Sequence, residues 1–475
     1  MSTARIRRHP DLAALALLLA VGLLIRAAIL FRAPAFFVGG DSQTYLAPAY
    51  GLARGGDWDL GVRRPPGYPL FLAGVIAVLG EDMRGVVLAQ HLLGLTTAIG
   101  AYGLGRAVAG RAAGILAGLA VAVSGPLLVY EHYVMAEALF GALLTAAAWA
   151  LLAARGAKGG WLALLGGALL AAGWLTRPAA LLLVPLIPLA LLGLRPWRRV
   201  VVLSALAGVG FALVAAPWIV FTLQRSGTVG SVGIGNTLMW RVTREEPALI
   251  QPRDSWPSRE GDELATARRY AFGRATRKDL PDDIADAVQE RFGLSESAAD
   301  RVLAATAIEA IRARPLLYLQ STARLALELF IGEEQHLGGQ GKEAGTERYP
   351  NPQDKYQTWW DPRIRHIPQP PTAPEAAEFE RTRAIVTLFQ PHRIGGLLLA
   401  LCLAGLAAGL LAPRYRGALF LAAAILTSLL GATALAGSFP RFRYPLDPLI
   451  LTLAATGAVA ALAAARRATR SFWPA

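Results

Sequence analysis

Long apolar runs separated by short basic segments fill the first half and the last fifth of the chain. The first run, residues 12–31, has about 20 residues, enough for a helix to cross the hydrocarbon core of a bilayer. Arg5, Arg7 and Arg8 precede it and place the N-terminus in the cytoplasm. A cleaved signal peptide is the competing interpretation, but the run is long and lacks a small-x-small exit. Arg26 lies near the outer end, where we expect its guanidinium to snorkel to the interface.

Residues 67–79 are also apolar, but with only about 13 residues they predict an interfacial helix rather than a span. With this choice every short basic loop falls on one side of the membrane, as the positive-inside rule demands, and both termini are cytoplasmic. If this segment spanned the bilayer, the arginines at 106 and 111 would face outward. The ten predicted spans are residues 12–31, 86–104, 112–130, 138–153, 161–175, 179–194, 200–223, 394–411, 418–435 and 446–465.

Composition agrees with a membrane protein. Of the 475 residues, 54% are hydrophobic and 17% charged, and the mean hydropathy is +0.42, which excludes a soluble protein of this size. The net charge of +14 would also suit nucleic acid, but arginines in cytoplasmic loops that meet anionic lipid headgroups account for it. We therefore expect membrane lipids as partners and no nucleic acid. The high Ala, Leu, Gly and Arg content is typical of a GC-rich bacterial genome, which suggests the bacterial inner membrane.

The chain divides by composition into three parts. Residues 1–223 form an N-terminal membrane module with a first outer loop at 32–85, and residues 394–475 form a C-terminal three-helix membrane segment. Between them, residues 224–393 are polar and predict a long extracytoplasmic loop. The expected fold is an all-α polytopic membrane protein with about ten transmembrane helices and interfacial helices in the first outer loop.

Two amphipathic helices are predicted within the long loop. Residues 281–292 carry apolar side chains one turn apart and are closed by Gly293. Ser297-x-x-Asp300 predicts a capping box for a second helix. The apolar row of that helix is Leu303, Ala307 and Ile311.

Two further segments of this loop are harder to place from periodicity. Residues 316–331 are long enough to span, but they contain Gln320, Arg324 and Glu328, and a span would invert the basic loops that follow. We predict a helix at the membrane surface. Residues 332–374 show weak periodicity and predict a mobile lid.

Asp41 is the leading candidate for chemistry. It follows Gly39 and Gly40, which let the backbone approach a ligand closely, and it lies just outside the first span. A helix N-cap or a solvated loop carboxylate is the competing interpretation. Arginines should be rare at turns of the outer face, so those present there indicate an anionic partner. Contact with lipid headgroups or internal salt bridges would also explain them. The polar residues expected at this face are Tyr45, Arg63, Arg64, Glu131, His132, Glu137, Arg177, Arg441, Arg443 and Tyr444.

Short motifs occur in a characteristic order along these loops. They are Gly-Asp-Ser-x-x-Tyr at 40–45, Arg-Pro-Pro-Gly-Tyr-Pro at 64–69, Arg-x-x-x-Gly-Arg at 106–111 and Arg-x-Arg-Tyr-Pro-x-x-Pro at 441–448. The pattern resembles the C-type membrane glycosyltransferases that use polyprenyl-phosphate sugars. Within that group it resembles the Rgt-type lipopolysaccharide galacturonosyltransferases, the aminoarabinose transferases and the protein mannosyltransferases. The resemblance covers about the first 220 residues and the last 80.

The resemblance implies an inverting transfer from a polyprenyl-phosphate sugar to a lipid, glycan or protein acceptor at the extracytoplasmic face. Asp41 would serve as general base, and Glu137, or less well Glu131, would be the second carboxylate of the family. Protein-mannosyltransferase relatives often carry Asp-Glu where this chain has Asp41-Ser42.

The chemistry of such a transfer suits arginines. The departing lipid phosphate is a weak base and needs no general acid, but it needs fixed cations, for which Arg63, Arg64, Arg177, Arg441 and Arg443 are the candidates. No HExxH motif or Cys/His cluster is present, and Cys402 is the one cysteine, so we predict no metal and no cofactor. Some distant relatives bind a divalent metal.

A secondary transporter or lipid flippase is the alternative function. About ten spans with internal prolines would suit it. Ionisable residues within the spans are nearly absent, however, and the main exception, His91, is interpreted as a packed core histidine. A receptor or scaffold would explain the long loop but not the arginine turns.

Overall fold

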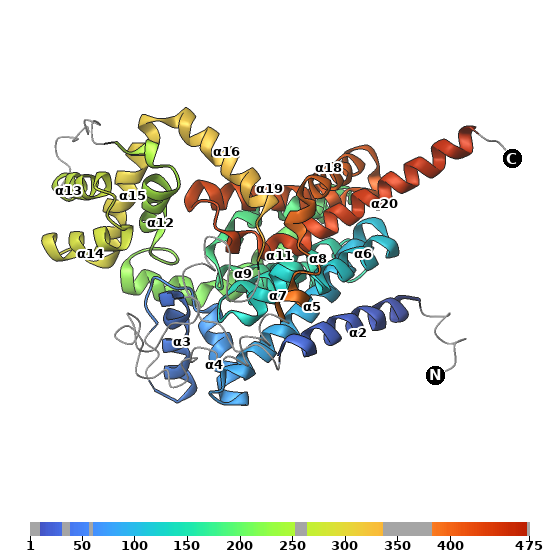
Figure 1. Ribbon diagram of the computed structural model, residues 1–475, viewed down its shortest axis with the longest axis horizontal. Coiled ribbons are helices and arrows are strands. Elements are labelled where there is room, and N and C mark those ends of the chain that lie inside the picture. The colour runs from blue at the N-terminus through green and yellow to red at the C-terminus, as the bar shows by residue number, and fades with distance from the viewer. Residues whose placement is uncertain (1–9, 31–38, 57–59, 252–263, 336–381, 473–475) are drawn as a thin grey trace.

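The computed structural model describes residues 10–30, 39–56, 60–251, 264–335 and 382–472, and within these ranges it is built from helices without any strand (Figure 1). The predicted all-α polytopic class is confirmed. The predicted lid falls outside the described residues, apart from 332–335.

Six helical stretches in the described part of the chain are long and apolar enough to cross a membrane, and a seventh is possible if the pair α6 (Arg111–Ala122) and α7 (Gly125–His132), bent by 48°, counts as one span. The six contain α2 (Pro10–Leu30), α5 (Met83–Ala109), α11 (Trp197–Ser226), α18 (Gly395–Leu411), α19 (Gly417–Leu435) and α20 (Asp447–Phe472).

Three more of the predicted spans correspond to shorter apolar helices. They are α8 (Glu137–Ala153), α9 (Gly159–Trp174) and the pair η1 (Pro178–Leu186) and α10 (Ile187–Ala190). All ten predicted runs are thus helical, and the number of ten transmembrane helices stays a prediction.

Glycines allow the shorter helices to pack closely. A Cβ on Gly167 of α9 would collide with the Ala207 carbonyl of α11, and one on Gly210 of α11 would collide with the Leu164 carbonyl of α9. Small residues at such a crossing let two backbones touch, which is how helices associate where no water drives their burial.

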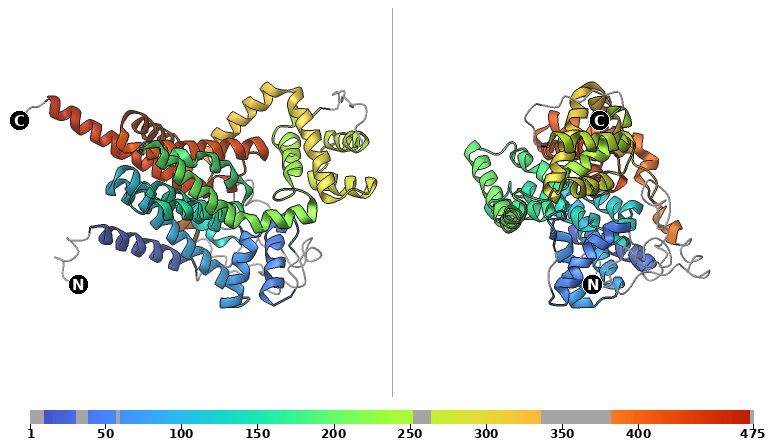
Figure 2. Two further views of the ribbon diagram at one scale, coloured as in Figure 1. Left: turned by 180° about the vertical axis from the view of Figure 1, so that it is seen from behind. Right: turned by 90° about the vertical axis from the view of Figure 1, so that its left-hand side faces the viewer.

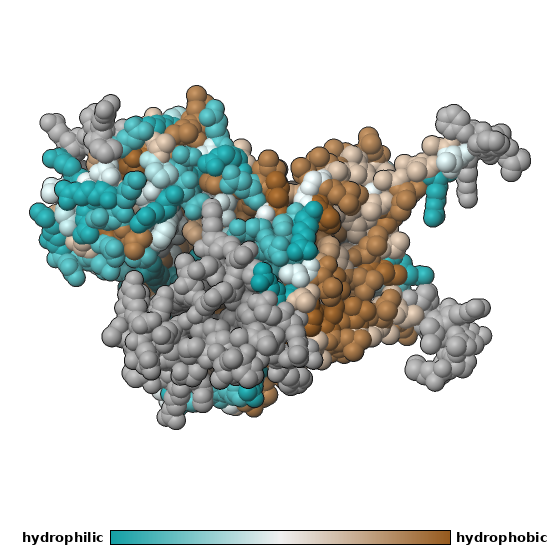
Figure 3. Space-filling view, in the orientation of Figure 1, coloured by the Kyte–Doolittle hydropathy of each residue, from teal (hydrophilic) through white to brown (hydrophobic). Residues whose placement is uncertain are grey.

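The long helices share one direction, and two short ones cross it. Figures 1 and 2 show α2, α5 and α20 running along the bundle, with α2 beginning and α20 ending at the same end. At the opposite end α3 (Gly39–Ala53) and α4 (Gly67–Leu79) stand side by side across this direction. Helix α4 has the bounds predicted for an interfacial helix. Hydrophobic residues cover the visible flank of the bundle (Figure 3).

The helices from α12 to α16 form a separate, hydrophilic-surfaced lobe beyond α3 (Figures 1 and 3). Its own core includes Ile284, Val288, Leu303 and Ala307. Helix α16, which leads from this lobe back to the bundle, packs against α19. The elements are α12 (Ile234–Trp240), η2 (Arg241–Glu245), η3 (Pro247–Leu249), α13 (Ala265–Thr276), α14 (Pro281–Phe292), α15 (Glu296–Ala313) and α16 (Pro315–Ile331).

One predicted cap is correct and one is wrong. Helix α14 ends at Gly293, whose φ of 61° suits a residue without a Cβ. Helix α15, however, is capped by Ser295, which accepts the Ala298 N–H, so Ser297 is not its N-cap. The Asp300 carboxylate accepts backbone N–H groups at the start of α12 instead, because it lies on the face of α15 that packs there.

Candidate active site

Asp41 lies in the first turn of α3 and bridges two arginines from distant parts of the chain. Its Oδ1 accepts a hydrogen bond from Arg64 Nη2, and its Oδ2 lies 2.5 Å from Arg441 Nη1. Burial raises the pKa of Asp41, but the two guanidiniums outweigh this effect and hold the pKa well below its usual range. Asp41 is therefore ionised at neutral pH, with both oxygens engaged.

Neighbouring residues hold α3 in this position. Ser42 is fully buried, and its hydroxyl donates to the Val134 carbonyl at 3.0 Å. The Tyr45 ring lies 5.1 Å from the Arg64 guanidinium carbon and packs edge-on against Tyr68. A glutamate would not fit at the buried Ser42 position without moving this contact.

The Arg-Pro-Pro-Gly turn carries Arg64 to the site. Pro65 and Pro66 limit the backbone before α4 begins at Gly67. The Gly67 N–H donates to the Leu175 carbonyl at 2.6 Å, and a Cβ at Gly67 would lie 2.7 Å from that oxygen. This close approach places Arg64 beside the turn that contains Arg177.

Glu137 and Arg177 form the second ion pair of the site. Glu137 opens α8 and is buried; its Oε1 accepts from Arg177 Nη1, while its buried Oε2 has no hydrogen-bond partner among the described residues. Arg177 also reaches the backbone carbonyl of Arg441 at 3.5 Å and covers the Phe442 ring. Arg441 and Phe442 belong to η6 (Pro440–Phe442), followed by η7 (Tyr444–Leu446).

These contacts join residues from five segments of the chain, and we call this group of residues the Asp41 cluster. It holds three guanidiniums and two carboxylates, so its formal charge is +1 when both acids are ionised. A fixed, partly dehydrated cationic cluster of this kind recognises an anion such as a phosphate. Its members are Asp41, Tyr45, Arg64, Glu137, Arg177 and Arg441.

Other predicted site residues lie outside the cluster. Arg63 points to the lobe, where it pairs with Asp282 at 2.6 Å. Arg443 is fully buried and donates to the Phe330 carbonyl and to the carboxylate of Asp447. Tyr444 is also buried, and its hydroxyl donates to the Glu333 carbonyl at 2.9 Å.

Glu131 and His132 belong to a network inside the bundle. Glu131 accepts from Arg26 at 2.6 Å and contacts His91 Nδ1 at 2.5 Å, and His91 Nε2 lies 2.7 Å from His132 Nδ1. The prediction that Arg26 snorkels to the interface is wrong, because its guanidinium is buried against Glu131 and the Ala122 carbonyl. His91 is buried, as expected, but it is part of this polar chain.

Sequence reasoning missed Gln90, which fixes the segment after α7. Its Oε1 accepts from the Tyr68 hydroxyl at 2.7 Å, and its Nε2 donates to the carbonyls of Glu131 and Tyr133 at 2.9 Å. A lone glutamine within an apolar span was the available signal, since such a group needs partners in the bundle.

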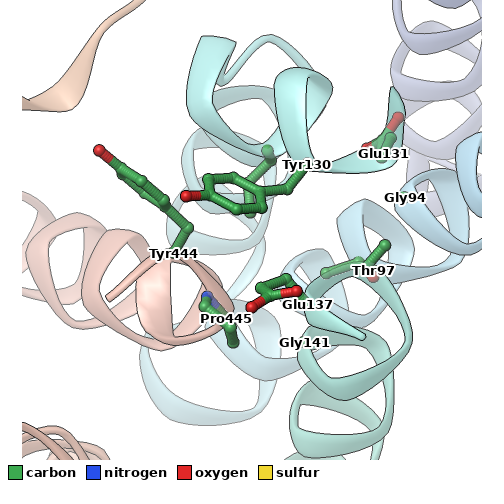
Figure 4. A pocket seen from close by; sticks show the side chains of 10 residues that line it. Gly94, Thr97, Tyr130, Glu131, Glu137, Gly141, Tyr444 and Pro445 are labelled. Atoms are coloured by element: carbon green, nitrogen blue, oxygen red, sulfur yellow. The ribbon is translucent and has the colours of Figure 1, made fainter. Parts of the chain in front are cut away.

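A small cavity separates the two glutamates. Side chains of α5, α7, α8 and η7 line it, among them Glu131, Glu137, Tyr130 and Tyr444 (Figure 4). Its volume of about 20 Å³ is enough for about one water molecule.

A shallow apolar groove of about 430 Å³ follows the outer face of α4. It is lined by Leu70, Phe71, Gly74, Val75, Val78 and Leu79, and Leu70 lies one turn beyond Gly67. The groove therefore begins close to the turn that carries Arg64.

The described residues contain no group of three or more His, Cys, Asp or Glu side chains that could hold a metal ion. The two carboxylates of the Asp41 cluster are each paired with arginine instead.

The fold and the cluster define a helical membrane protein with three arginines paired to two carboxylates at one end of its bundle. Residues 63–221 match the family model described as dolichyl-phosphate-mannose-protein mannosyltransferase, which confirms the resemblance to the C-type membrane glycosyltransferases. The match includes Arg64, Glu137 and Arg177, and leaves out Asp41 and Arg441. No curated protein sequence matches the chain.

Among solved structures, the fold is similar to that of the archaeal oligosaccharyltransferase AglB from Archaeoglobus fulgidus in complex with an inhibitory peptide and a dolichol-phosphate, with a TM-score of 0.51 and 11% identity. The similarity covers 98% of this chain and 52% of AglB, so the chain spans about half the length of that protein. ArnT from Cupriavidus metallidurans bound to undecaprenyl phosphate matches with a TM-score of 0.39 and 16% identity, over 96% of this chain and 79% of ArnT.

Proposed function

We propose that the protein is a membrane glycosyltransferase that moves a sugar from a polyprenyl-phosphate donor to an acceptor hydroxyl at the Asp41 cluster. The observation that carries this proposal is the convergence of Arg64, Arg177 and Arg441 on two carboxylates beside an apolar groove. The match of residues 63–221 to the mannosyltransferase family model supports it, as does the dolichol-phosphate in the AglB complex.

The donor fits the charges of this region. A phosphodiester carries about one negative charge, which balances the formal +1 of the cluster, and its prenyl chain lies along the groove on α4. As the bond between the anomeric carbon and the phosphate oxygen breaks, negative charge grows on the phosphate. Arginines fixed before the reaction stabilise that charge without reorganising, which is the usual source of large rate effects. A metal is not required for this step.

Asp41 acts as the general base. It takes the proton of the acceptor hydroxyl while that oxygen attacks the anomeric carbon from the side opposite the phosphate, so the configuration inverts. Glu137 holds Arg177 against the C-terminal turn. Direct contact with the substrate stays a prediction for the remaining site residues, Arg63, Glu131, His132, Arg443 and Tyr444.

The extracytoplasmic face is the proposed side of the reaction. Helix α8 begins at Glu137 in the cluster and ends at Ala153, just before Arg155, and its 17 residues give a rise of roughly 25 Å. The cluster and the basic loop at Arg155 therefore lie at opposite ends of this helix. Because basic short loops face the cytoplasm, the cluster faces away from it.

A lipid flippase is the second candidate, and the buried Arg26–Glu131–His91–His132 network favours it. Ionisable groups inside a bundle are typical of ion-coupled transport. The two functions differ in whether the phosphodiester is cleaved.

The proposal is tested with purified protein in liposomes, a panel of polyprenyl-phosphate sugars and candidate acceptors, following the release of polyprenyl phosphate. We expect release by the wild-type protein, a loss of about 10²–10³-fold in Arg441→Ala, and unchanged release in Arg274→Ala, whose arginine pairs with Asp279 in the lobe. Translocation of the lipid without cleavage of any donor would favour the flippase.

A further inference from the structure

We infer that Asp41 occupies the place of the donor phosphate between Arg64 and Arg441 in the unliganded protein, and that the phosphate displaces it on binding. This inference rests on the proposed function for the identity of the anion. It makes Asp41 a competitor of the substrate as well as the residue that later receives the proton.

The geometry of the carboxylate carries the argument. Asp41 offers one oxygen to each guanidinium, with Arg64 on Oδ1 and Arg441 on Oδ2. A phosphate offers two oxygens to two guanidiniums in the same manner, and such charge-assisted contacts are the strongest that arginine makes. The two arginines lie 23 and 400 residues from Asp41 in sequence, so only the tertiary fold brings them together around one anion.

Exposure distinguishes this ion pair from the other one in the cluster. The side chains of Asp41, Arg64 and Arg441 are 26%, 32% and 22% exposed, so an anion can reach them from outside. The Glu137 side chain is only 2% exposed and is shielded by Arg177. Arg64 Nε is also buried without a hydrogen-bond partner among the described residues. This guanidinium therefore has one N–H group that can donate to a bound anion.

The exchange explains how a carboxylate held by two arginines can act as a base. While both guanidiniums remain on it, the pKa of Asp41 is too low for efficient proton transfer. When the phosphate takes the guanidiniums, Asp41 loses its two cationic partners and its pKa rises toward the ordinary value. The base is thus activated where and when the donor is bound.

The charges balance through the cycle. Two contacts to Asp41 are replaced by two contacts to the phosphodiester, and the formal charge of the site falls from +1 to about 0. Transfer then places the acceptor proton on Asp41 and the electrons of the broken carbon–oxygen bond on the departing phosphate. When Asp41 loses that proton to solvent, it regains both arginines and displaces the polyprenyl phosphate product.

The test measures binding of a fluorescent short-chain polyprenyl phosphate to protein in nanodiscs of neutral lipid. Asp41→Asn keeps the size of the side chain but removes the competing charge, so we expect binding at least about tenfold tighter than in the wild-type protein, or about 1.4 kcal/mol. Asp41→Ala provides the same comparison if the Asn variant does not fold. The matched control is Asp279→Asn, because Asp279 pairs with Arg274 at 2.5 Å and is 29% exposed, and it should leave binding unchanged.

Equal or weaker binding by both Asp41 variants would overturn the inference, as would an equal gain in Asp279→Asn. Two further arms identify the source of the phosphate. Inorganic phosphate should compete only weakly, because it lacks a prenyl chain, and phosphatidylglycerol in the nanodisc should not compete. Competition by phosphatidylglycerol as strong as that by the prenyl phosphate would assign the arginines to a bilayer headgroup and contradict the inference.

This measurement separates the inference from the proposed function. If no donor is cleaved but Asp41→Asn binds the lipid phosphate more tightly, the transferase fails and the phosphate exchange stands. If donors are cleaved and binding does not tighten, the exchange fails alone.

Discussion

Replacing Arg26 by Met removes the positive charge that Glu131 faces inside the bundle. Both side chains are 3% exposed and their charged atoms lie 2.6 Å apart, so the remaining carboxylate would be shielded from bulk water. Removing one partner of a buried ion pair costs about 3–5 kcal/mol. Arg26 also donates to the Gly22 and Ala122 carbonyls, and each lost hydrogen bond adds about 0.5–1.5 kcal/mol.

Glu131→Gln leaves the opposite problem, a buried guanidinium without its counter-charge. The double variant R26M/E131Q holds neither charge, so we expect it to lose less stability than the two single variants together. The difference, the coupling energy, should be about 2 kcal/mol or more. Reversible unfolding of the four proteins in mixed detergent micelles measures it.

A matched surface pair provides the control for this cycle. Arg54 and Glu81 lie 2.7 Å apart but are 30% and 29% exposed, so their coupling should stay below about 1 kcal/mol. A coupling between Arg26 and Glu131 within about 0.5 kcal/mol of zero would refute the reasoning, because it would show that water or His91 compensates either charge.

Three other predictions follow from single contacts. Ser295→Ala should destabilise the lobe by about 1 kcal/mol in thermal unfolding, whereas Ser297→Ala should change its stability little. The reverse order would favour Ser297 as the N-cap, as expected from the sequence. Because the folded-state pKa of Asp41 is depressed, its ion pairs stabilise the protein fully above about pH 4 and are lost below it. The difference in melting temperature between wild type and Asp41→Asn should therefore be constant from about pH 8 to 5. Disappearance of this difference by pH 6 would contradict the prediction. Gly74→Leu should fill the α4 groove and raise the KM for long-chain donors several-fold. Gly208→Leu is the control, because a Cβ at Gly208 also meets open space, and it should leave the KM unchanged. Equal KM values for the two variants would exclude the groove as the path of the prenyl chain.

The sequence was informative wherever a rule is local. The apolar run at 67–79 predicted the bounds of α4. Its placement at the interface, inferred because about 13 residues are too few to cross a bilayer, stays a prediction. Gly293 predicted the end of α14 from its freedom at positive φ. The predicted topology assigned Asp41, Arg64 and Arg441 to one face of the membrane, and the structure brings these three into contact.

Pairwise partners could not be predicted in the same way. Arg63 and Arg64 are adjacent, yet the Pro-Pro turn sends one to the lobe and the other to Asp41. The contacts of Arg26 with Glu131 cross from α2 to α7, and no pattern along the chain encodes such a pairing. Arg443 lies two residues from Arg441 in a tight turn, so it faces the interior instead of the cluster.

Turnover by Asp41→Asn tests the central claim most directly. With wild-type protein in liposomes, phosphorus NMR should show a polyprenyl-phosphate sugar converted into polyprenyl phosphate in the presence of an acceptor. The account predicts that Asp41→Asn, folded and able to bind the lipid phosphate, loses this conversion by about 10²-fold or more, because the amide cannot take the acceptor proton. Conversion at the wild-type rate in Asp41→Asn would contradict the assignment of Asp41 as the base.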